Sequence, residues 1–477
     1  MTYSITKAEL ELQSRREELN LRWYPRYHLA ARAGWMNDPN GLVWFDGWYH
    51  AFYQHHPYST QWGPMHWGHA RSKDLVHWEH LPVALAPEGP EDKDGCFSGS
   101  AVVDGDTLAL IYTGHKFHGD PDDEANLYQV QCLATSRDGI HFARQGMIVD
   151  TPPGLHHFRD PKVWREGESW YMVVGARDGE TGQVRVYRSA DLREWQDMGV
   201  LAVAEKEMGY MWECPDFFTL SGKRVLMFSP QGLAAEGFEN RNLFQSGYLV
   251  GEWQPGQHFV REGEFVEMDR GHDFYAPQSF LTPDGRRIVI GWLDMWESPL
   301  PEQEDGWAGM LSLPRELTLS ADNRLQMRPA REVESLRGAW FPWPVSTLTN
   351  QQIALVERCD ALEVILQWDC ANSTAEHYGI RLGTGLRVYI DAQMQRLVLE
   401  RYYPQYGLCG SRSVALNLNN ALNLRLFFDR SSVEVFVNEG EACLSSRIYP
   451  DEDCRDLALF AWTGEASLIH GGAWQLE

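Results

Sequence analysis

Gly41-Leu-Val-Trp-Phe-Asp-Gly-Trp-Tyr-His-Ala-Phe-Tyr-Gln54 contains two apolar strands joined by an Asp-Gly turn. The same unit, an entry marked by Pro or Gly and then two apolar strands around a turn, starts again at Gly99, Asp160, Cys214 and Ala276. Short strands bounded by turn residues indicate antiparallel sheet. A unit that recurs at intervals of about 60 residues buries its faces only against its neighbours. The repeat therefore predicts a ring of similar sheets.

A second, shorter repeat lies downstream within the units. Ser72-Lys-Asp-Leu-Val-His-Trp78, Ser136-Arg-Asp-Gly-Ile-His-Phe142 and Ser189-Ala-Asp-Leu-Arg-Glu-Trp195 share the pattern S-x-D-[LG]-x-x-[WF]. A series of β-sandwiches would also give short strands, but it would not predict two nested repeats in phase. Five such units favour a five-bladed β-propeller, which we expect over residues 23–328.

Two short helices are expected to frame the propeller. Thr6-Lys7-Ala8-Glu9 has the pattern of a capping box and predicts an amphipathic helix to about residue 20, within an N-terminal segment 1–22. Pro329 to Leu336, with Gly338 just beyond, predicts a linker helix at 329–339, because Pro favours helix starts and Gly helix ends.

The pattern changes after residue 340. Leu422, Leu424 and Leu426 alternate with polar residues, and a second alternating run ends at the turn Asn438-Glu439-Gly440. This period of two predicts an antiparallel β-sandwich over 340–477. We expect an all-β protein in which the sandwich packs against the propeller, with sugar binding by the sandwich as the alternative.

Charge and composition exclude several classes of partner. The formal net charge is −25, whereas nucleic acids and anionic membranes bind clustered Lys and Arg. The first twenty residues carry four Glu and no continuous apolar run, which is not the pattern of a secretory signal. We therefore expect a cytoplasmic protein without nucleic-acid or membrane partners.

Cysteine and histidine spacing gives no metal signature. The eight cysteines form no C-x-x-C pair, so we interpret them as reduced thiols. His55, His56, His66 and His69 cluster in sequence, but no carboxylate–His ligand spacing accompanies them. We expect neither a metal nor another cofactor, with zinc at these histidines as the alternative.

Three acidic residues stand at the entries of predicted units: Asp38 in Trp35-Met-Asn-Asp-Pro-Asn-Gly41, Asp160 in Phe158-Arg-Asp-Pro161, and Glu213 in Trp212-Glu-Cys-Pro215. Singly, an Asp before Pro is usually a turn residue and a Glu is usually solvated. Equivalent entries of successive blades converge on a propeller axis, so these acids are expected to face one another. Crowded carboxylates raise the proton affinity of at least one. The result is the ionised acid beside a protonated one that glycosidic cleavage needs.

These segments resemble the invertase, or β-fructofuranosidase, family of glycoside hydrolases (family 32). Phe52-Tyr-Gln54 and Phe97-Ser-Gly99 also match, and the similarity runs from about Tyr24 to the end of the chain. The resemblance implies a propeller followed by a sandwich, in agreement with the repeats. It also implies hydrolysis of the terminal β-D-fructofuranoside of sucrose with retention. In that reaction Asp38 is the nucleophile, Glu213 the acid/base, and Asp160 the stabiliser of the transition state.

Substrate contacts are expected from the same matches: Asn37, Gln54, Trp62, Phe97 and Ser98, with Tyr275 and Trp292 as weaker matches. Amide groups donate and accept hydrogen bonds at once, which suits vicinal hydroxyls. Arg159 is expected either to hold Asp160 ionised and contact hydroxyls, or to form an ion pair with a neighbouring carboxylate.

Competing functions are an inverting arabinan- or xylan-cleaving enzyme and a non-catalytic fructan-binding lectin. The matched motifs weigh against the first, and the presence of all three acids weighs against the second. Within the family we expect unphosphorylated sucrose as substrate, because the motifs contain no Lys/Arg cluster for a phosphate. Sucrose 6-phosphate, longer fructans and fructosyl transfer are the alternatives, and the sequence does not fix the oligomeric state.

Overall fold

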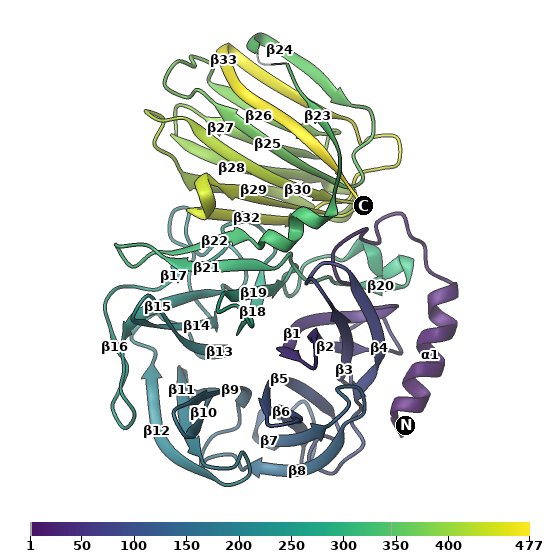
Figure 1. The fold of residues 1–477 in the computed structure, drawn as a ribbon, viewed down its shortest axis with the longest axis vertical. Coiled ribbons are helices and arrows are strands. Elements are labelled where there is room, and N and C mark those ends of the chain that lie inside the picture. Colours follow the sequence, from purple (N-terminus) through teal and green to yellow (C-terminus); the bar gives the residue numbers. More distant parts are fainter. Residues whose placement is uncertain (1, 345) are drawn as a thin grey trace.

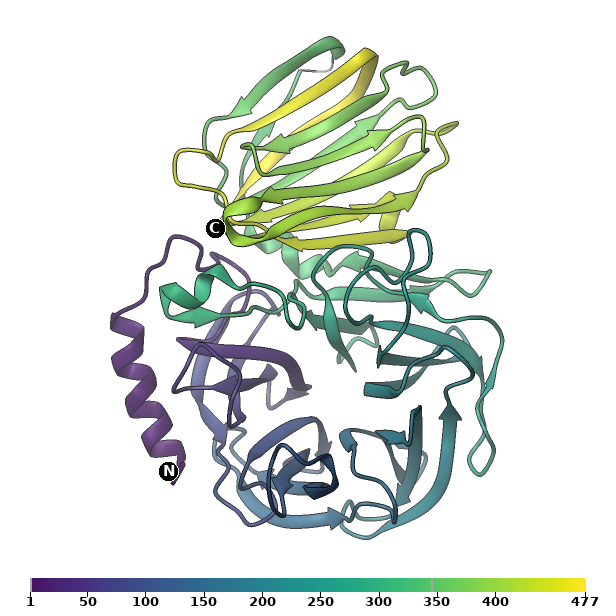
Figure 2. The ribbon, with the colours of Figure 1, turned by 180° about the vertical axis from the view of Figure 1, so that it is seen from behind.

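The computed structural model describes residues 2–344 and 346–477, which fold into a five-bladed β-propeller and a C-terminal β-sandwich (Figures 1 and 2). This confirms the all-β fold class predicted from the repeats. Both views show the blades arranged in a ring and the sandwich stacked against one side of that ring. The boundaries expected at 23–328 and 340–477 stay a prediction.

Each blade is an antiparallel sheet that begins with its innermost strand. Blade 1 is β1 (Gly34–Phe45), β2 (Trp48–His56), β3 (His66–Ser72) and β4 (Trp78–Leu85); blade 2 is β5 (Gly95–Asp104), β6 (Thr107–Phe117), β7 (Leu127–Ser136) and β8 (Ala143–Val149). Blade 3 is β9 (Phe158–Glu166), β10 (Ser169–Asp178), β11 (Thr181–Ser189) and β12 (Trp195–Val203). Blade 4 is β13 (Met211–Leu220), β14 (Lys223–Gln231), β15 (Gly247–Glu252), β16 (Val260–Arg261) and β17 (Val266–Glu267). Blade 5 is β18 (Tyr275–Leu281), β19 (Arg287–Trp292), β21 (Arg315–Leu319) and β22 (Leu325–Pro329).

The ring is closed by a short parallel pairing between blade 5 and blade 1. β20 (Trp307–Ala308) lies between β19 and β21 in sequence but pairs with the start of β1, Gly34 with Trp307. A short 3₁₀ helix, η2 (Pro301–Asp305), leads into it. The last blade is thereby tied to the first.

The S-x-D repeat forms the turn between the third and fourth strands of blades 1 to 3. In blade 1 the Ser72 hydroxyl donates to Asp74 at 3.0 Å, and Asp74 accepts from the backbone N–H groups of Val76 and His77 at 3.2 and 2.9 Å. Asp138 and Asp191 accept the same backbone bonds in blades 2 and 3. The Asp carboxylate thus replaces the ladder partners that a tight turn lacks.

The N-terminal helix α1 (Ile5–Glu17) packs on blade 1 through the buried side chains of Ala8 and Leu12. Its N-cap is Ser4, whose hydroxyl accepts from the N–H of Lys7 at 3.2 Å. The predicted cap at Thr6 is therefore wrong, because Ser4 offers the same oxygen and the chain turns helical two residues earlier.

The linker differs from the expected helix at 329–339. Pro329 ends strand β22, and residues Arg331–Leu336 form a 3₁₀ helix, η3. Gly338 lies inside the next strand, β23 (Arg337–Pro342), and not after the helix. Both flanking residues are thus strand residues, and the Pro-to-Gly pattern overstated the length of the helix.

The sandwich contains β23, β24 (Ser346–Val356), β25 (Leu362–Trp368), β26 (His377–Leu382), β27 (Leu386–Asp391), β28 (Arg396–Tyr403), β29 (Leu408–Ala415), β30 (Leu422–Asp429), β31 (Ser432–Val437), β32 (Ala442–Arg447) and β33 (Leu457–Leu476). The first half of β33 pairs with β26 and the second half with β25. This long strand joins the β26–β29 layer to the β25, β30–β32 layer. Two 3₁₀ turns of the sandwich, η4 (Pro404–Tyr406) and η5 (Asn438–Gly440), connect strands. In the propeller, a further 3₁₀ turn, η1 (Glu124–Asn126), precedes β7.

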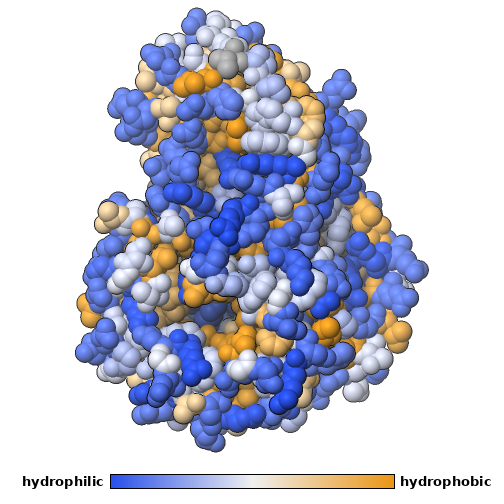
Figure 3. Space-filling model, viewed as in Figure 1, coloured by the Kyte–Doolittle hydropathy of each residue, from blue (hydrophilic) through white to orange (hydrophobic). Residues whose placement is uncertain are grey.

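The surface is hydrophilic over most of the face shown in Figure 3, including the line where the two domains meet. This agrees with a net charge of −25. Within the described ranges, none of the helices has the length and apolarity that a membrane crossing requires.

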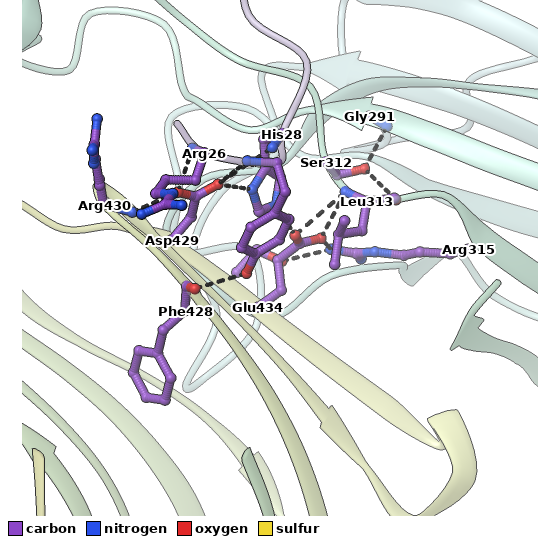
Figure 4. Close-up of polar contacts among 12 residues, drawn as sticks. Arg26, His28, Gly291, Ser312, Leu313, Arg315, Phe428, Asp429, Arg430 and Glu434 are labelled. Atoms are coloured by element: carbon purple, nitrogen blue, oxygen red, sulfur yellow. Dashed lines mark hydrogen bonds and ion pairs between the residues drawn. The ribbon is translucent and has the colours of Figure 1, made fainter. Parts of the chain in front are cut away.

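Buried ion pairs join the two domains (Figure 4). His28, before blade 1, contacts Asp429 at 2.8 Å and Glu434 at 2.5 Å, both on the sandwich. Arg315 of blade 5 binds Glu434 at 2.8 Å and Asp269 at 2.9 Å. We call His28, Asp269, Arg315, Asp429 and Glu434 the interface network. Its opposite charges pair with one another at positions closed to solvent, so removal of one partner would leave a buried charge unpaired.

Candidate active site

A β-bulge interrupts the first strand of every blade near its start. The register shifts lie between Met36 and Pro39 in β1, Phe97 and Gly99 in β5, Arg159 and Lys162 in β9, Glu213 and Asp216 in β13, and Tyr275 and Gln278 in β18. Four of the bulges contain a proline, Pro39, Pro161, Pro215 or Pro277. Proline has no N–H for the ladder and is tolerated in a sheet at bulges. Because a bulge redirects side chains, the same place in each blade presents a residue to the axis.

Backbone strain collects at these bulges. Asp160, Cys214 and Ala276 each directly precede a bulge proline and have φ values of +70°, +47° and +51°. A non-glycine residue in this region costs about 1–3 kcal/mol and persists only where the surroundings hold it. Such strain clusters at functional sites, and here it marks three neighbouring blades.

The three acids do not share one position in the repeat. Asp38 and Asp160 directly precede their prolines, whereas Glu213 lies two residues before Pro215. The expectation that all three acids occupy the same position of the repeat is therefore wrong for Glu213, which lies one residue earlier than the other two. Cys214 occupies the place equivalent to the two aspartates.

Cys214 lies between the two aspartates. Its thiol sulfur is 3.5 Å from Asp38 Oδ2 and 3.5 Å from Asp160 Oδ2, and its backbone N–H donates to Asp160 Oδ2 at 2.9 Å. Asp38 also accepts from the Ser98 hydroxyl at 2.6 Å and from Asn37 Nδ2 at 3.1 Å. Residues 38, 98, 160 and 214, from the first four blades, thus form one contiguous polar cluster.

Glu213 is held by four donor groups. Arg159 Nε and Nη2 donate to its Oε2 at 3.0 and 2.9 Å. Gln231 Nε2 donates to Oε1 at 2.9 Å, and the Tyr275 hydroxyl donates to the same oxygen at 2.7 Å. Arg159 therefore makes its ion pair with Glu213 and not with Asp160, so of the two roles expected for it the structure has the neighbouring ion pair. Contacts at both oxygens fix the plane of the carboxylate.

Burial and mutual repulsion raise the proton affinity of the two aspartates. Burial is the largest cause that brings the pKa of Asp38 to about 6, with the charge of Glu213 adding to it and the bonds from Ser98 and Asn37 opposing it. Burial, followed by the charge of Glu213, raises the pKa of Asp160 to about 7, against the attraction of Arg159. At neutral pH Asp38 is mainly ionised, whereas Asp160 is partly protonated.

These residues line a cavity of about 460 Å³. The lining includes nine of the eleven predicted site residues: Asn37, Asp38, Gln54, Trp62, Phe97, Ser98, Arg159, Asp160 and Glu213. A larger cavity of about 640 Å³ lies elsewhere on the propeller, around Asp216 and Lys162, and does not contain the three acids. The facing carboxylates, and not cavity size, identify the smaller one as the candidate active site.

Two predicted contacts lie behind the cavity wall. Tyr275 is buried and reaches the cavity only through its bond to Glu213. Trp292 is fully buried, and its ring packs against Trp35 and Trp296 with centroids 6.0 and 4.9 Å apart. Trp296 is the tryptophan of this stack that lines the cavity.

Sequence reasoning missed several lining residues, among them His115, Gln129, His157, Gln231 and Trp296. A signal for Gln231 was present, since it ends the second strand of blade 4 much as Gln54 stands near the end of the second strand of blade 1. His115 stacks on Phe97 at 3.9 Å. No sequence motif predicted a role for His115 in the site, because a single histidine within a strand is usually a packing residue.

The histidines considered for zinc are otherwise engaged. His55, His56 and His66 each donate from Nδ1 to a backbone carbonyl, and His69 contacts His50 at 2.9 Å. No cluster of three metal-ligating side chains occurs among the residues described here.

Comparison with known proteins places this cavity in a family. The N-terminal domain of glycosyl hydrolases family 32 matches residues 28–329, and the C-terminal part of the same family matches residues 332–475. The chain is 56% identical to a sucrose-6-phosphate hydrolase of Escherichia coli over 98% of both chains. It is 55% identical to a raffinose invertase of Escherichia coli over 98% of this chain and 100% of that one. A solved β-fructofuranosidase of Bombyx mori superposes with a TM-score of 0.87 at 38% identity, over 99% of this chain and 98% of that chain.

Proposed function

This chain belongs to glycosyl hydrolase family 32, and on that premise we propose that it splits the terminal β-D-fructofuranosidic bond of sucrose-type sugars with Asp38 as nucleophile and Glu213 as acid and base. It is a glycoside hydrolase of the β-fructofuranosidase type. The observation that carries the residue assignment is the cluster of Asp38, Asp160 and Glu213 in one cavity, with Cys214 bridging the two aspartates.

Double displacement assigns Asp38 and Glu213 different tasks. Asp38 attacks the anomeric carbon of the fructosyl unit while Glu213 gives its proton to the departing glycosidic oxygen. Glu213 then takes a proton from water, and that water releases fructose from Asp38. Asp38 suits the first role because Ser98, Asn37 and Cys214 fix its carboxylate, and its pKa of about 6 leaves it ionised at neutral pH.

Asp160 and Arg159 are proposed to serve the transition state. Asp160 is buried and keeps one of its carboxylate oxygens, Oδ1, free of the Cys214 contacts. It is therefore placed to accept from fructose hydroxyls as positive charge develops on the ring. Arg159 orients Glu213. Trp62 and Phe97, whose rings meet edge to face at 6.0 Å, offer apolar faces to the sugar.

Two forms of the glucosyl unit are candidates. Sucrose 6-phosphate is favoured by the activity for which the Escherichia coli relative is named, which supports it better than our expectation of unphosphorylated sucrose. Unphosphorylated sucrose is favoured by the cavity, whose one arginine, Arg159, already binds Glu213, and whose wall carries the further acid Glu297. A phosphate group binds best to cations that are free to pair with it.

Initial rates of fructose release from sucrose, sucrose 6-phosphate and inulin test the proposal, with Asp38→Asn as the inactive control. We expect kcat/KM for at least one of the two disaccharides to exceed that for inulin by more than about tenfold, since a 460 Å³ cavity encloses a small sugar. A preference of more than about tenfold between the disaccharides, about 1.4 kcal/mol, decides the phosphorylation state. No fructose release from either disaccharide would overturn the proposal.

A cytoplasmic location belongs to the same proposal. A phosphate ester carries about two negative charges at neutral pH and does not cross a bilayer unaided, so a hydrolase for sucrose 6-phosphate acts where that sugar is made. Fractionation of cells that express the full chain checks this, and activity confined to the medium would contradict it.

A further inference from the structure

A second cavity, of about 340 Å³, lies where the propeller meets the sandwich. Arginines from three separate segments line it: Arg270 after β17, Arg324 before β22, and Arg396 at the start of β28. We call this cavity the arginine cleft. It shares no lining residue with the active-site cavity, and the proposed function does not use it.

Two of the three arginines lack a carboxylate partner. Arg270 forms an ion pair with Glu239. Neither Arg324 nor Arg396 has a carboxylate oxygen within 4.0 Å in the part of the chain that the structure describes. The Arg396 guanidinium donates to the hydroxyl and carbonyl oxygens of Ser413 and stacks over Phe238 at 3.8 Å. Those contacts orient Arg396 and leave its charge uncompensated.

The three acids that line the cleft do not pair with Arg324 or Arg396. Glu239 pairs with Arg270, and Glu267 lies 3.9 Å from the same guanidinium. Glu267 is buried, which raises the pKa of its carboxyl to about 7, so it is only partly charged at neutral pH. Glu441 is exposed and accepts from Asn438. The cleft thus holds as many glutamates as arginines, but among the described residues no carboxylate oxygen lies within 4.0 Å of the Arg324 or Arg396 guanidinium.

The proximity of the three arginines affects the pKa of Arg270. Burial, followed by the charges of Arg324 and Arg396, lowers the pKa of Arg270 to about 10. Like charges that share a cavity repel one another. A bound anion would relieve the repulsion and form charge-assisted hydrogen bonds with the same groups.

We propose that the arginine cleft binds a small phosphate ester, with the phosphate group held by Arg270, Arg324 and Arg396. A cavity of about 340 Å³ exceeds the needs of an inorganic anion and lies at the lower end of the range for small-molecule sites. The side chains of Met268, Met327 and Val414 supply an apolar wall for a carbon skeleton. A sugar monophosphate has both the charge and the size.

The ligand would also bridge the two domains. Arg270 and Arg324 belong to the propeller, whereas Arg396 and Val414 belong to the sandwich. A ligand that binds the folded, docked state stabilises that state by mass action. Binding should therefore raise the unfolding temperature as well as give a calorimetric signal.

Isothermal titration of the full chain tests the site, with glucose 6-phosphate, inorganic phosphate and unphosphorylated glucose as separate probes. The Asp38→Asn background with excess sucrose keeps the active site occupied. We expect saturable binding of glucose 6-phosphate, weaker binding of inorganic phosphate and none of glucose. The double substitution Arg324→Gln/Arg396→Gln should weaken glucose 6-phosphate binding by at least about tenfold, because each lost charged hydrogen bond is worth about that factor.

The matched control is Arg137→Gln/Arg193→Gln, which removes the same charge from two exposed arginines outside the cleft. It should leave the dissociation constant within about twofold. Arg324→Gln alone, at an exposed position, guards against misfolding of the double variant and should weaken binding by at least about threefold. Equal weakening by the control pair, or no saturable binding of glucose 6-phosphate, would overturn the proposal.

Discussion

The domain interface and the active-site cavity each contain two buried carboxylates. At the interface, Asp429 is 2% and Glu434 0% exposed; in the cavity, Asp38 is 9% and Asp160 5% exposed. Bonds from His28 lower the pKa of Asp429, and His28 with Arg315 lowers that of Glu434 to about 2, against the effect of burial. In the cavity burial prevails, and the pKa values of Asp38 and Asp160 rise to about 6 and about 7. Among these four carboxylates burial alone therefore does not decide the direction of the pKa shift: the two that bond to His28 are lowered, and the two without a cation partner are raised.

The difference separates two uses of buried charge. A carboxylate with its own cation contributes to the fold, provided that both partners remain. A carboxylate without one costs stability and keeps its reactivity, and such perturbed groups cluster at functional sites. Arg159 is the cation of the cavity, and it binds Glu213 and not either aspartate.

The largest effect is expected for Glu213→Gln, which keeps the shape of the side chain and removes its proton transfer. Without proton assistance to the leaving group, kcat on sucrose should fall by about two to four orders of magnitude. A glutamine can still accept from Gln231 and Tyr275, but it leaves Arg159 without its carboxylate partner, so the unfolding temperature should also fall.

Near-normal turnover of Glu213→Gln would refute the assignment. The next acids in sequence offer poor replacements: Glu207 is exposed, and Asp216 is buried against Ser279 beside the 640 Å³ cavity.

At the interface, Glu434→Gln should destabilise the protein by about 3–5 kcal/mol, since it leaves Arg315 and His28 as buried cations without their shared partner. Thermal unfolding followed by calorimetry measures this. Glu465→Gln, at an exposed position on the sandwich, is the control and should shift the transition by less than about 1 °C. If both variants unfold at the same temperature, the interface network does not stabilise the docked sandwich.

The stability of the protein should also depend on pH through His28. The pKa of His28 is raised to about 9 by its bonds to Asp429 and Glu434, although burial opposes this. Its stabilising effect is present in full below about pH 6.5 and is lost as pH rises through about 9, a difference of about 3 kcal/mol. The unfolding temperature should therefore fall between pH 7 and 10, and His28→Gln should flatten that slope. The exposed His141→Gln should not; a wild-type slope in both variants would contradict the account.

An effect of opposite sign on stability is expected for Asp160→Asn. Because the pKa of Asp160 is raised in the folded state, its ionisation costs stability as pH rises from about 4 to about 7. The variant should be inactive, yet unfold a few degrees higher than wild type at pH 8 and at the same temperature near pH 4. A lower unfolding temperature at pH 8 would show that Asp160 serves the fold and not the chemistry.

The blades were predictable from sequence because each repeats the same pair of apolar strands around one turn. The three acids were found because a repeat converts distant positions into neighbours on one axis. The sequence did not predict the β-bulges. Glu213 lies one residue further from its proline than Asp38 does, and this offset becomes visible only from the pairing of each strand with its neighbour. The predicted ring placed two carboxylates near Arg159, and the three-dimensional structure shows that Arg159 pairs with Glu213. The interface network was hidden for the same reason, because His28 and Glu434 meet from opposite ends of the chain.

Asp38, a buried carboxylate without a cation of its own, is proposed to attack the anomeric carbon. This requires Asp38 and Glu213 to stand about 5 Å apart, without a water between them. The most direct test follows the first seconds of sucrose hydrolysis by NMR, before mutarotation mixes the products. We expect β-fructofuranose to appear first and an added alcohol to yield a β-fructoside. If α-fructofuranose appears first, Asp38 activates water and the covalent mechanism is wrong.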